Sequence, residues 1–365
     1  MIPETLLNKI QRGQYLKPDE ALQLWSKADL PELMELADKI RQDKHPGNKV
    51  SWIIDRNVNL TNICFSRCLF CNFCVKKQNP EAYVLSIDDY RKKIGELFAL
   101  GGDQLLLQGG MNPELGLDYY VDLFSSLKKE YPTLKLHALG PPEIVWLSKQ
   151  SGKSYTEVLK TLIDAGLDSL PGAGAEILSD RVRKIVSPGK ASVKEWLDVM
   201  RAAHKLGMIT SATMMFGFLE SIKERLEHLL LIRDLQDERP AGTPGFTAFI
   251  PWPYQRENTR LHQAFPDMPD VYAAEYLKII AISRILLPNI PNIQASWLTV
   301  GQDTASIALH AGANDLGSVM IEENVVSAAG AHYSLSPEGM KELIRNSEFE
   351  PVRRNQAYDY LKDQD

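Results

Sequence analysis

The chain has 365 residues, of which 44% are hydrophobic and 24% are charged, and its formal net charge at pH 7 is −6. This composition is typical of a globular protein that buries a large core without disulfides. The 41 basic and 47 acidic side chains are dispersed without a polybasic run, which argues against nucleic acid as a partner. No run approaches the ~18 apolar residues of a membrane span and no signal peptide is evident, so we expect a cytoplasmic protein that binds no membrane.

The amino-terminal segment, residues 1–49, has the apolar spacing of short amphipathic helices, and we predict a helical cap there. Beyond it, β-rich runs alternate with helical segments. The strand-like runs are residues 58–63, 104–107, 134–139, 168–170, 210–216, 246–251, 293–297 and 317–321. Eight such runs predict an α/β fold, a parallel (β/α)8 TIM-type barrel over residues 50–330, because their span is close to the roughly 250 residues typical of such barrels. For residues 331–365 we predict a helix and a strap, with no chemistry.

Catalytic residues of such barrels lie at the carboxyl ends of the strands. Unusual residues follow most of the predicted strands. After the cysteine-rich first loop these are QGGMNP (108–113), GPPE (140–143), PGAGAE (171–176), MMFGFLE (214–220), PWPYQRENT (251–259) and QASWLTVGQD (294–303). Because these segments should meet at one mouth of the barrel, they predict an enzyme.

All four cysteines lie in the stretch NICFSRCLFCNFCV, and the first three, Cys64, Cys68 and Cys71, have the spacing CxxxCxxC. This spacing lets a short loop bind three irons of a 4Fe-4S cluster and leaves the fourth iron without a protein ligand. A zinc site usually draws on two separated CxxC pairs, and a disulfide framework would join nothing distant. Buried inert thiols remain an alternative. We predict that Cys74, which would close the open iron, is not a ligand.

A cluster of this kind on a barrel rim, with Phe70 before the last cysteine, resembles the radical S-adenosylmethionine (SAM) superfamily. The resemblance implies that SAM binds the open iron, that a one-electron reductant such as flavodoxin or ferredoxin reduces the cluster, and that a 5′-deoxyadenosyl radical takes a hydrogen atom from the substrate. It also suggests which residues contact the cofactor. These are Phe70, Gln108, the glycine motif Gly109 and Gly110, Glu176 for ribose or ammonium, and Met214 on the strand that lies along adenine.

Longer runs, such as AGLDSLPGAGAEILSDRVRKIVSPGK and GANDLGSVMIEENVVSAAG, resemble the cyclic dehypoxanthine futalosine synthases of menaquinone biosynthesis. Aminofutalosine synthases and deazaflavin (F420) synthases share the cysteine loop, but QGG, IPWPYQ and QASW favour the cyclase. The resemblance implies hydrogen abstraction from ribose C4′ of dehypoxanthine futalosine and ring closure onto its benzoate ring. A non-catalytic metal-binding barrel is the alternative from a different class, and it would hold colourless zinc rather than iron and sulfide.

The remaining candidates are interpreted singly. His137, in the third predicted strand, is either a catalytic base or substrate ligand, or a core histidine with satisfied hydrogen bonds. Glu176 is also a catalytic candidate, whereas Glu143 and Glu220 suit the first turn of a helix. Arg256 is the preferred ligand for the benzoate carboxylate. Gln294 and Trp297 are expected either to line the substrate pocket or to fill the barrel interior.

Overall fold

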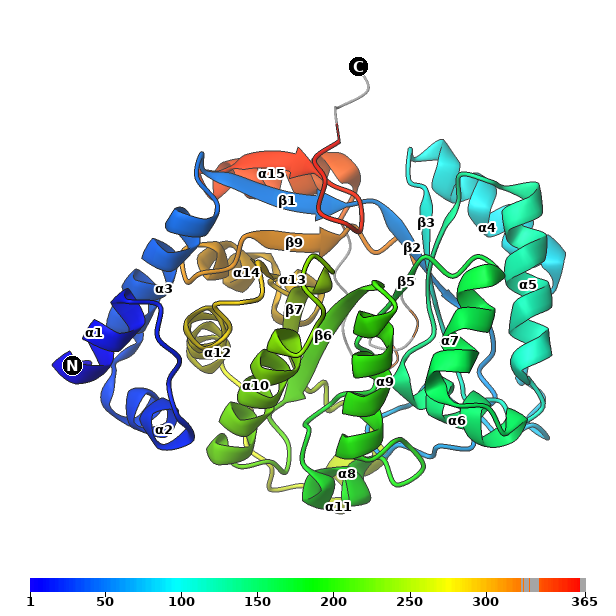
Figure 1. Cartoon of the computed structure of the whole chain (residues 1–365), viewed down its shortest axis with the longest axis horizontal. Coiled ribbons are helices and arrows are strands. Elements are labelled where there is room, and N and C mark those ends of the chain that lie inside the picture. Colours follow the sequence, from blue (N-terminus) through cyan, green and yellow to red (C-terminus); the bar gives the residue numbers. More distant parts are fainter. Residues whose placement is uncertain (323, 325–327, 329–334, 362–365) are drawn as a thin grey trace.

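The computed structural model describes residues 1–322, 324, 328 and 335–361 (Figure 1). Its main sheet has seven parallel strands that pair in chain order and curve into a partial barrel. These strands are β2 (Asp55–Asn59), β3 (Gln104–Gln108), β4 (Lys135–Ala138), β5 (Ser169–Leu170), β6 (Ile209–Phe216), β7 (Gly245–Pro253) and β8 (Asn292–Ile293). The predicted parallel α/β fold is therefore confirmed.

A second parallel sheet stands between β8 and β2, with the strand order β10-β1-β9. It consists of β1 (Lys49–Ile53), β9 (Asp315–Ser318) and β10 (Glu350–Arg353). The Ala295 amide donates to the Asp315 carbonyl at 2.9 Å, so β9 is tied to the end of β8. The eighth strand, expected at residues 317–321, is thus β9, but it pairs with β1 instead of closing one continuous eight-stranded barrel. The chain changes sheets at Ile54, because β1 pairs with β9 whereas β2 pairs with β3.

Three helices form the expected amino-terminal cap: α1 (Glu4–Gln11), α2 (Pro18–Lys27) and α3 (Leu30–Lys44). Helix α3 packs on α12 (Ala273–Leu286), and α2 packs on α10 (Ile222–Asp237). The other helices are α4 (Ile87–Ala99), α5 (Leu117–Glu130), α6 (Pro141–Ser151), α7 (Tyr155–Asp164), α8 (Asp180–Val186), α9 (Val193–Lys205), α11 (Arg260–Ala264), α13 (Trp297–Val300), α14 (Gln302–Leu309) and α15 (Pro337–Asn346). Several begin at a serine whose hydroxyl accepts from the amide three residues on, where an acidic side chain completes a capping box, as at Ser192 and Glu195.

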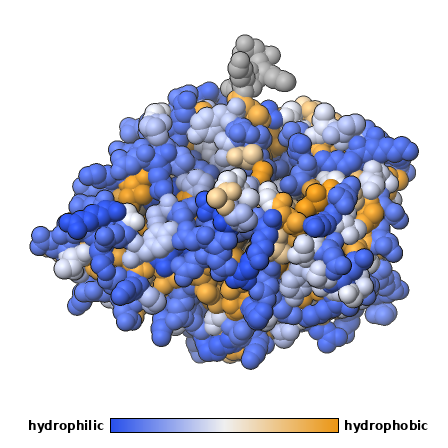
Figure 2. Space-filling model, viewed as in Figure 1, coloured by the Kyte–Doolittle hydropathy of each residue, from blue (hydrophilic) through white to orange (hydrophobic). Residues whose placement is uncertain are grey.

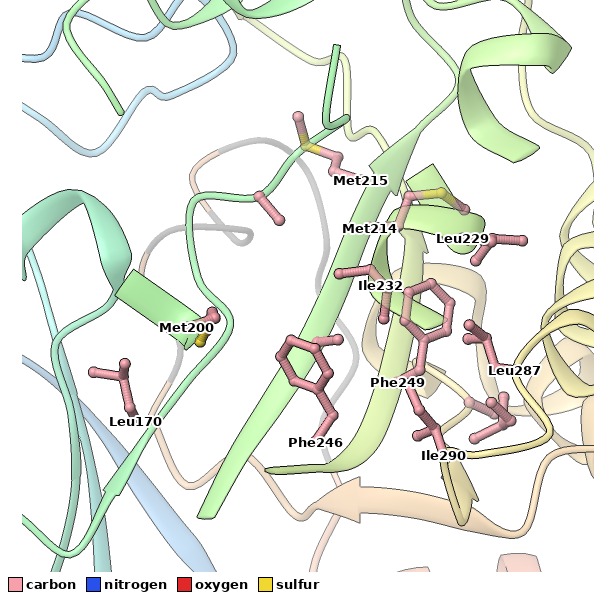
Figure 3. Close-up of a cluster of buried hydrophobic side chains, with 14 of the residues drawn as sticks. Leu170, Met200, Met214, Met215, Leu229, Ile232, Phe246, Phe249, Leu287 and Ile290 are labelled. Carbon is pink, nitrogen blue, oxygen red and sulfur yellow. The ribbon is translucent and has the colours of Figure 1, made fainter. Parts of the chain in front are cut away.

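The core fills the space between the strands and the outer helices. Figure 3 shows Met214 of β6 and Phe249 of β7 beside Leu229 and Ile232 of α10. All four side chains are fully buried. Met215 points to the opposite side of β6, as the alternation of a strand requires.

The face seen in Figure 2 is mostly hydrophilic, with apolar residues in small patches. In the described part of the chain, no helix combines the length and apolarity needed to cross a bilayer. The predicted boundary between barrel and tail, at residues 330 and 331, lies outside the described residues.

Candidate active site

The cysteine loop leaves the end of β2 and is held by main-chain hydrogen bonds to several neighbouring segments. The Gly110 amide donates to the Thr61 carbonyl at 2.7 Å, and the Leu69 amide donates to the Val186 carbonyl at 2.8 Å. Gly110 has to be glycine, because a Cβ there would lie 2.2 Å from the Ile63 carbonyl oxygen. The loop is thereby fixed at the carboxyl ends of the strands, where the sequence predicts it.

A cavity of about 920 Å³ extends from this loop into the partial barrel. Most of the predicted site residues line it. They are Cys64, Cys68, Phe70, Cys71, Gln108, Gly109, His137, Glu176, Gln294 and Trp297, together with Cys74. The structure therefore brings together residues from the cysteine loop, β3, β4 and the segments that follow β5 and β8.

Three predicted residues lie outside the cavity lining. The Met214 side chain faces the helices, and Met215 takes the cavity-facing position, because the inference from the sequence chose the wrong face of β6. Gly110 packs against the cysteine loop. Arg256 pairs with Asp270 and lines a separate pocket of about 270 Å³, so its expected place beside the substrate is not observed.

The four thiols differ in protonation. A hydrogen bond with Cys74 lowers the pKa of Cys64 and of Cys71, and the same bonds raise the pKa of Cys74. The Sγ atoms of Cys71 and Cys74 are 3.6 Å apart. Burial raises the pKa of Cys68 to about 11. The contact with Cys74 thus favours the thiolate forms of Cys64 and Cys71, and the thiolate is the form that binds iron.

Within the residues that the structure describes, no group of three or more His, Cys, Asp or Glu side chains is arranged around a single point where a metal ion could bind.

A buried ion pair lies beside the cysteines. The Lys190 ammonium donates to Glu176 Oε1 at 2.6 Å and lies 5.3 Å from the centroid of the Phe70 ring. Burial lowers the pKa of Lys190, but the charges of Cys68 and Glu176 outweigh burial and raise it. Lys190 therefore stays positive and offsets negative charge on the thiolates and on Glu176.

His137 lies in the cavity wall, but its properties argue against a role as base. Its Nδ1 is 2.7 Å from the Ser169 hydroxyl. Burial, with a smaller contribution from the Arg354 charge, lowers the pKa of His137 to about 3. The imidazole is consequently neutral at pH 7 and a weak proton acceptor, so hydrogen bonding is the function that its surroundings favour.

The structure adds Glu143 to the site, although the sequence favoured an ordinary first-turn acid of α6. Glu143 lines the cavity, and its Oε2 atom is buried without a hydrogen-bond partner among the described residues. Burial raises its pKa to about 7, against the lowering effect of Lys190. A carboxylate in this condition is a candidate for contact with a bound polar molecule.

Replacing Glu143 should change how stability depends on pH. The folded cofactor-free protein holds this proton more tightly than the unfolded chain, so the stabilisation is complete below about pH 4.5 and is lost as the pH rises through about 7. The difference corresponds to about 3 kcal/mol. Glu143→Gln should match the wild type near pH 4.5 and exceed its stability at pH 8, as measured by urea unfolding. Parallel pH curves for the two proteins would contradict this expectation.

Residues of the predicted strap also line the cavity, namely Arg354, Gln356 and Tyr358. They follow β10, which pairs with β1. Three side chains of β2, Asp55, Asn57 and Asn59, line it as well. For these three residues the sequence did contain a signal, namely polar residues at alternate positions directly before the cysteine loop. The pairing of β10 with the distant β1 left no comparable local signal.

Comparison with known families gives two matches. The Radical SAM superfamily matches residues 58–232, and the CofH/MqnC C-terminal region matches residues 243–365. A cyclic dehypoxanthine futalosine synthase of Streptomyces coelicolor is 40% identical over 98% of this chain and 88% of its own. A 5-amino-6-(D-ribitylamino)uracil–L-tyrosine 4-hydroxyphenyl transferase of Methanosarcina mazei is 39% identical over 98% of this chain and 91% of its own.

Solved structures share the fold at lower identity. Methylornithine synthase (PylB) superposes with a TM-score of 0.70 at 20% identity, over 96% of this chain and 98% of that one. The FeFe-hydrogenase maturase HydG gives a TM-score of 0.74 at 16% identity, over 95% of this chain and 75% of that one. These likenesses support the partial parallel barrel described above.

Proposed function

Because the chain belongs to the CofH/MqnC family of the radical SAM superfamily, whose members use a 4Fe-4S cluster and SAM, we propose that it is a cyclic dehypoxanthine futalosine synthase. The observation that carries the proposal is 40% identity over 98% of the chain to such synthases from Streptomyces coelicolor and Halalkalibacterium halodurans. The ribitylaminouracil–tyrosine transferase reaction is the second candidate, because a relative with that activity is 39% identical.

The residues present fit the two cofactors. Cys64, Cys68 and Cys71, which have the CxxxCxxC spacing, would each bind one iron, and Cys74, which lies outside that spacing, would remain a thiol. Gly109 leaves room for close approach to its main chain at the cavity wall. The unpartnered oxygen of Glu143 is suited to accept a hydrogen bond from an ammonium or hydroxyl group of SAM. When bound and reduced, the cluster and SAM supply a 5′-deoxyadenosyl radical.

The chain's own contribution is to enclose and position the substrate. Trp297 is only 2% exposed, and its indole Nε1 donates to the Ser318 carbonyl at 3.0 Å, which fixes the ring as a flat wall of the cavity. Gln294 and Met215 line the same space. An enclosed cavity is needed because dissolved solutes such as reductants and oxygen would react with a carbon radical before it reached its target.

Product analysis with two substrates tests the proposal. Reconstituted, reduced enzyme with SAM is incubated with dehypoxanthine futalosine or with 5-amino-6-(D-ribitylamino)uracil plus L-tyrosine, and products are weighed by mass spectrometry. We expect free 5′-deoxyadenosine and a cyclised product that has lost two hydrogen atoms, from dehypoxanthine futalosine alone. Turnover confined to the ribitylaminouracil mixture would establish the second candidate.

A further inference from the structure

The inward face of β2 carries a polar stripe, which we define as Asp55, Asn57 and Asn59. Alternate residues of a strand point to the same side, and all three line the central cavity. The outward residue Arg56 instead binds Glu96 of α4 and, at 2.9 Å, Glu322. A stripe of polar side chains therefore faces a space in which most barrels pack branched apolar residues.

Each residue of the polar stripe has one buried atom without a hydrogen-bond partner in the described part of the chain: Asp55 Oδ1, Asn57 Oδ1 and Asn59 Nδ2. The residues are 6%, 5% and 2% exposed. Their other side-chain bonds are few. Gln104 Nε2 donates to Asp55 Oδ2 at 3.3 Å, the Ser318 hydroxyl also interacts with the Asp55 carboxyl group, and Asn324 Nδ2 donates to Asn59 Oδ1 at 3.1 Å. Buried groups without partners are costly and rare, so three in a row on one cavity wall need an explanation.

We propose that the polar stripe binds the hydroxyl-rich, five-carbon sugar part of the substrate. Asn57 Oδ1 is an acceptor and Asn59 Nδ2 is a donor, whereas burial raises the pKa of Asp55, so its carboxyl group can accept or, when protonated, donate. A hydroxyl group both donates and accepts, so it can satisfy each of them in turn. A carboxylate could not donate to Asn57, and an ammonium could not accept from Asn59.

The dimensions and position of the polar stripe agree with this ligand. Successive inward residues of a strand are about 6.6 Å apart, so the stripe spans roughly 13 Å and the hydroxyl groups of one pentose reach two of its residues. Asn59 is the last residue of β2, directly before the loop that carries Cys64. Asn57 pairs with Leu106, which pairs with His137, so these side chains share one layer of the barrel. A sugar held here lies next to the cysteine end of the cavity.

This inference rests on the proposed function, in which the bond that is broken belongs to a ribose. It is tested by binding and not by turnover. Isothermal titration of the cluster- and SAM-loaded enzyme would compare dehypoxanthine futalosine with an analogue that lacks the ribose 2- and 3-hydroxyl groups. The wild type should prefer the hydroxylated compound, and Asn57→Ala should reduce this preference about tenfold, the loss expected for one or two hydrogen bonds. Asn57→Leu, which keeps the side-chain volume, should do the same.

Asn292→Ala is the matched control. Asn292 is a buried asparagine of β8 whose Nδ2 donates to the Thr247 carbonyl and whose Oδ1 accepts from Asn314, both at 2.8 Å. This variant should lower the melting temperature and leave the preference between the two ligands unchanged. The Asn57 variants should keep or raise the melting temperature, because they remove an unsatisfied atom. An unchanged preference in them, or a melting temperature lowered as in the control, would overturn the proposal.

Failure of the polar stripe and failure of the proposed reaction give different results. Cyclised product together with an unchanged preference in the Asn57 variants would refute the stripe alone. If instead only ribitylaminouracil is turned over, the same titrations are made with that compound and with its pentylamino analogue, which has no hydroxyl groups. If the preference for the hydroxylated compound is smaller in Asn57→Ala than in the wild type, the polar stripe would be supported even though the proposed reaction is refuted.

Discussion

Cys68→Ala is expected to yield protein without a 4Fe-4S cluster and without detectable 5′-deoxyadenosine formation. Cys68 is the most buried of the three proposed ligands, and its carbonyl accepts a hydrogen bond from Arg260 at 2.9 Å, so the loop cannot easily bring another donor to its position. With two thiolates left, the cube loses one of its three protein ligands. Iron and acid-labile sulfide after anaerobic reconstitution, together with the absorbance of the cluster, give the measurement.

Cys74→Ala is the matched control on the same loop. We expect full iron content and unchanged cleavage of SAM, because Cys74 lies outside the CxxxCxxC spacing of the three proposed ligands. Iron loss from Cys74→Ala, or a normal cluster in Cys68→Ala, would show that the set of ligands is wrong.

Arg354→Met is expected to lower the free energy of unfolding by about 3–5 kcal/mol, the cost of removing one partner of a buried ion pair. Arg354 Nε donates to Asp315 Oδ2 at 2.6 Å and its Nη2 donates to Oδ1 at 2.9 Å. The side chains are 3% and 0% exposed, so Asp315 would be left as an uncompensated buried charge. Because the Arg354 charge also contributes to the low pKa of His137, that pKa should rise in the variant. Urea unfolding and NMR titration of the histidine measure the two effects.

Arg345→Met provides the comparison for an exposed ion pair. Arg345 lies 3.1 Å from Glu338, but the side chains are 54% and 63% exposed, and such pairs contribute at most about 1 kcal/mol. Replacing both buried partners, as in Arg354→Met with Asp315→Leu, should recover most of the lost stability. A single Arg354 variant as stable as the Arg345 variant would mean that the buried pair contributes little.

The sequence predicts the parts of the fold that have strong local patterns. Strand β6 is found within one residue of the predicted run 210–216, because six of the seven residues in that run are apolar or β-branched and turn signals flank it. The cysteine loop is also placed correctly, since loops after parallel strands converge at one end of the barrel.

Strand β2 shows why some strands were predicted at the wrong residues. Its sequence DRNVN has polar residues facing inward, so a search for apolar strands placed it at residues 58–63, three residues too late. β1 and β10 were not predicted, because their strand character depends on pairing between segments about 300 residues apart in the chain.

The choice among arginines and methionines failed for a related reason. Arg256 stands in an aromatic loop and looked suitable as a carboxylate ligand, but the described arginines that line the cavity are Arg67, Arg260 and, from the tail, Arg354. Met214 and Met215 differ only in the face of β6 that they occupy, and an error of one residue reverses that face.

The pairing of β10 with β1 has a consequence for how the reaction chamber is sealed. A chain cut before Glu350 would keep the whole cysteine loop and both glycines after β3, but it would lack Arg354, Gln356 and Tyr358 and open the chamber to solvent on the β1 side. Such a protein is expected to take up iron, but its radicals should be lost in side reactions with dissolved solutes. Binding of the cofactors thus depends on the cysteine loop in the first quarter of the polypeptide, whereas confinement of their reactivity depends on the segment after β10, close to its other end.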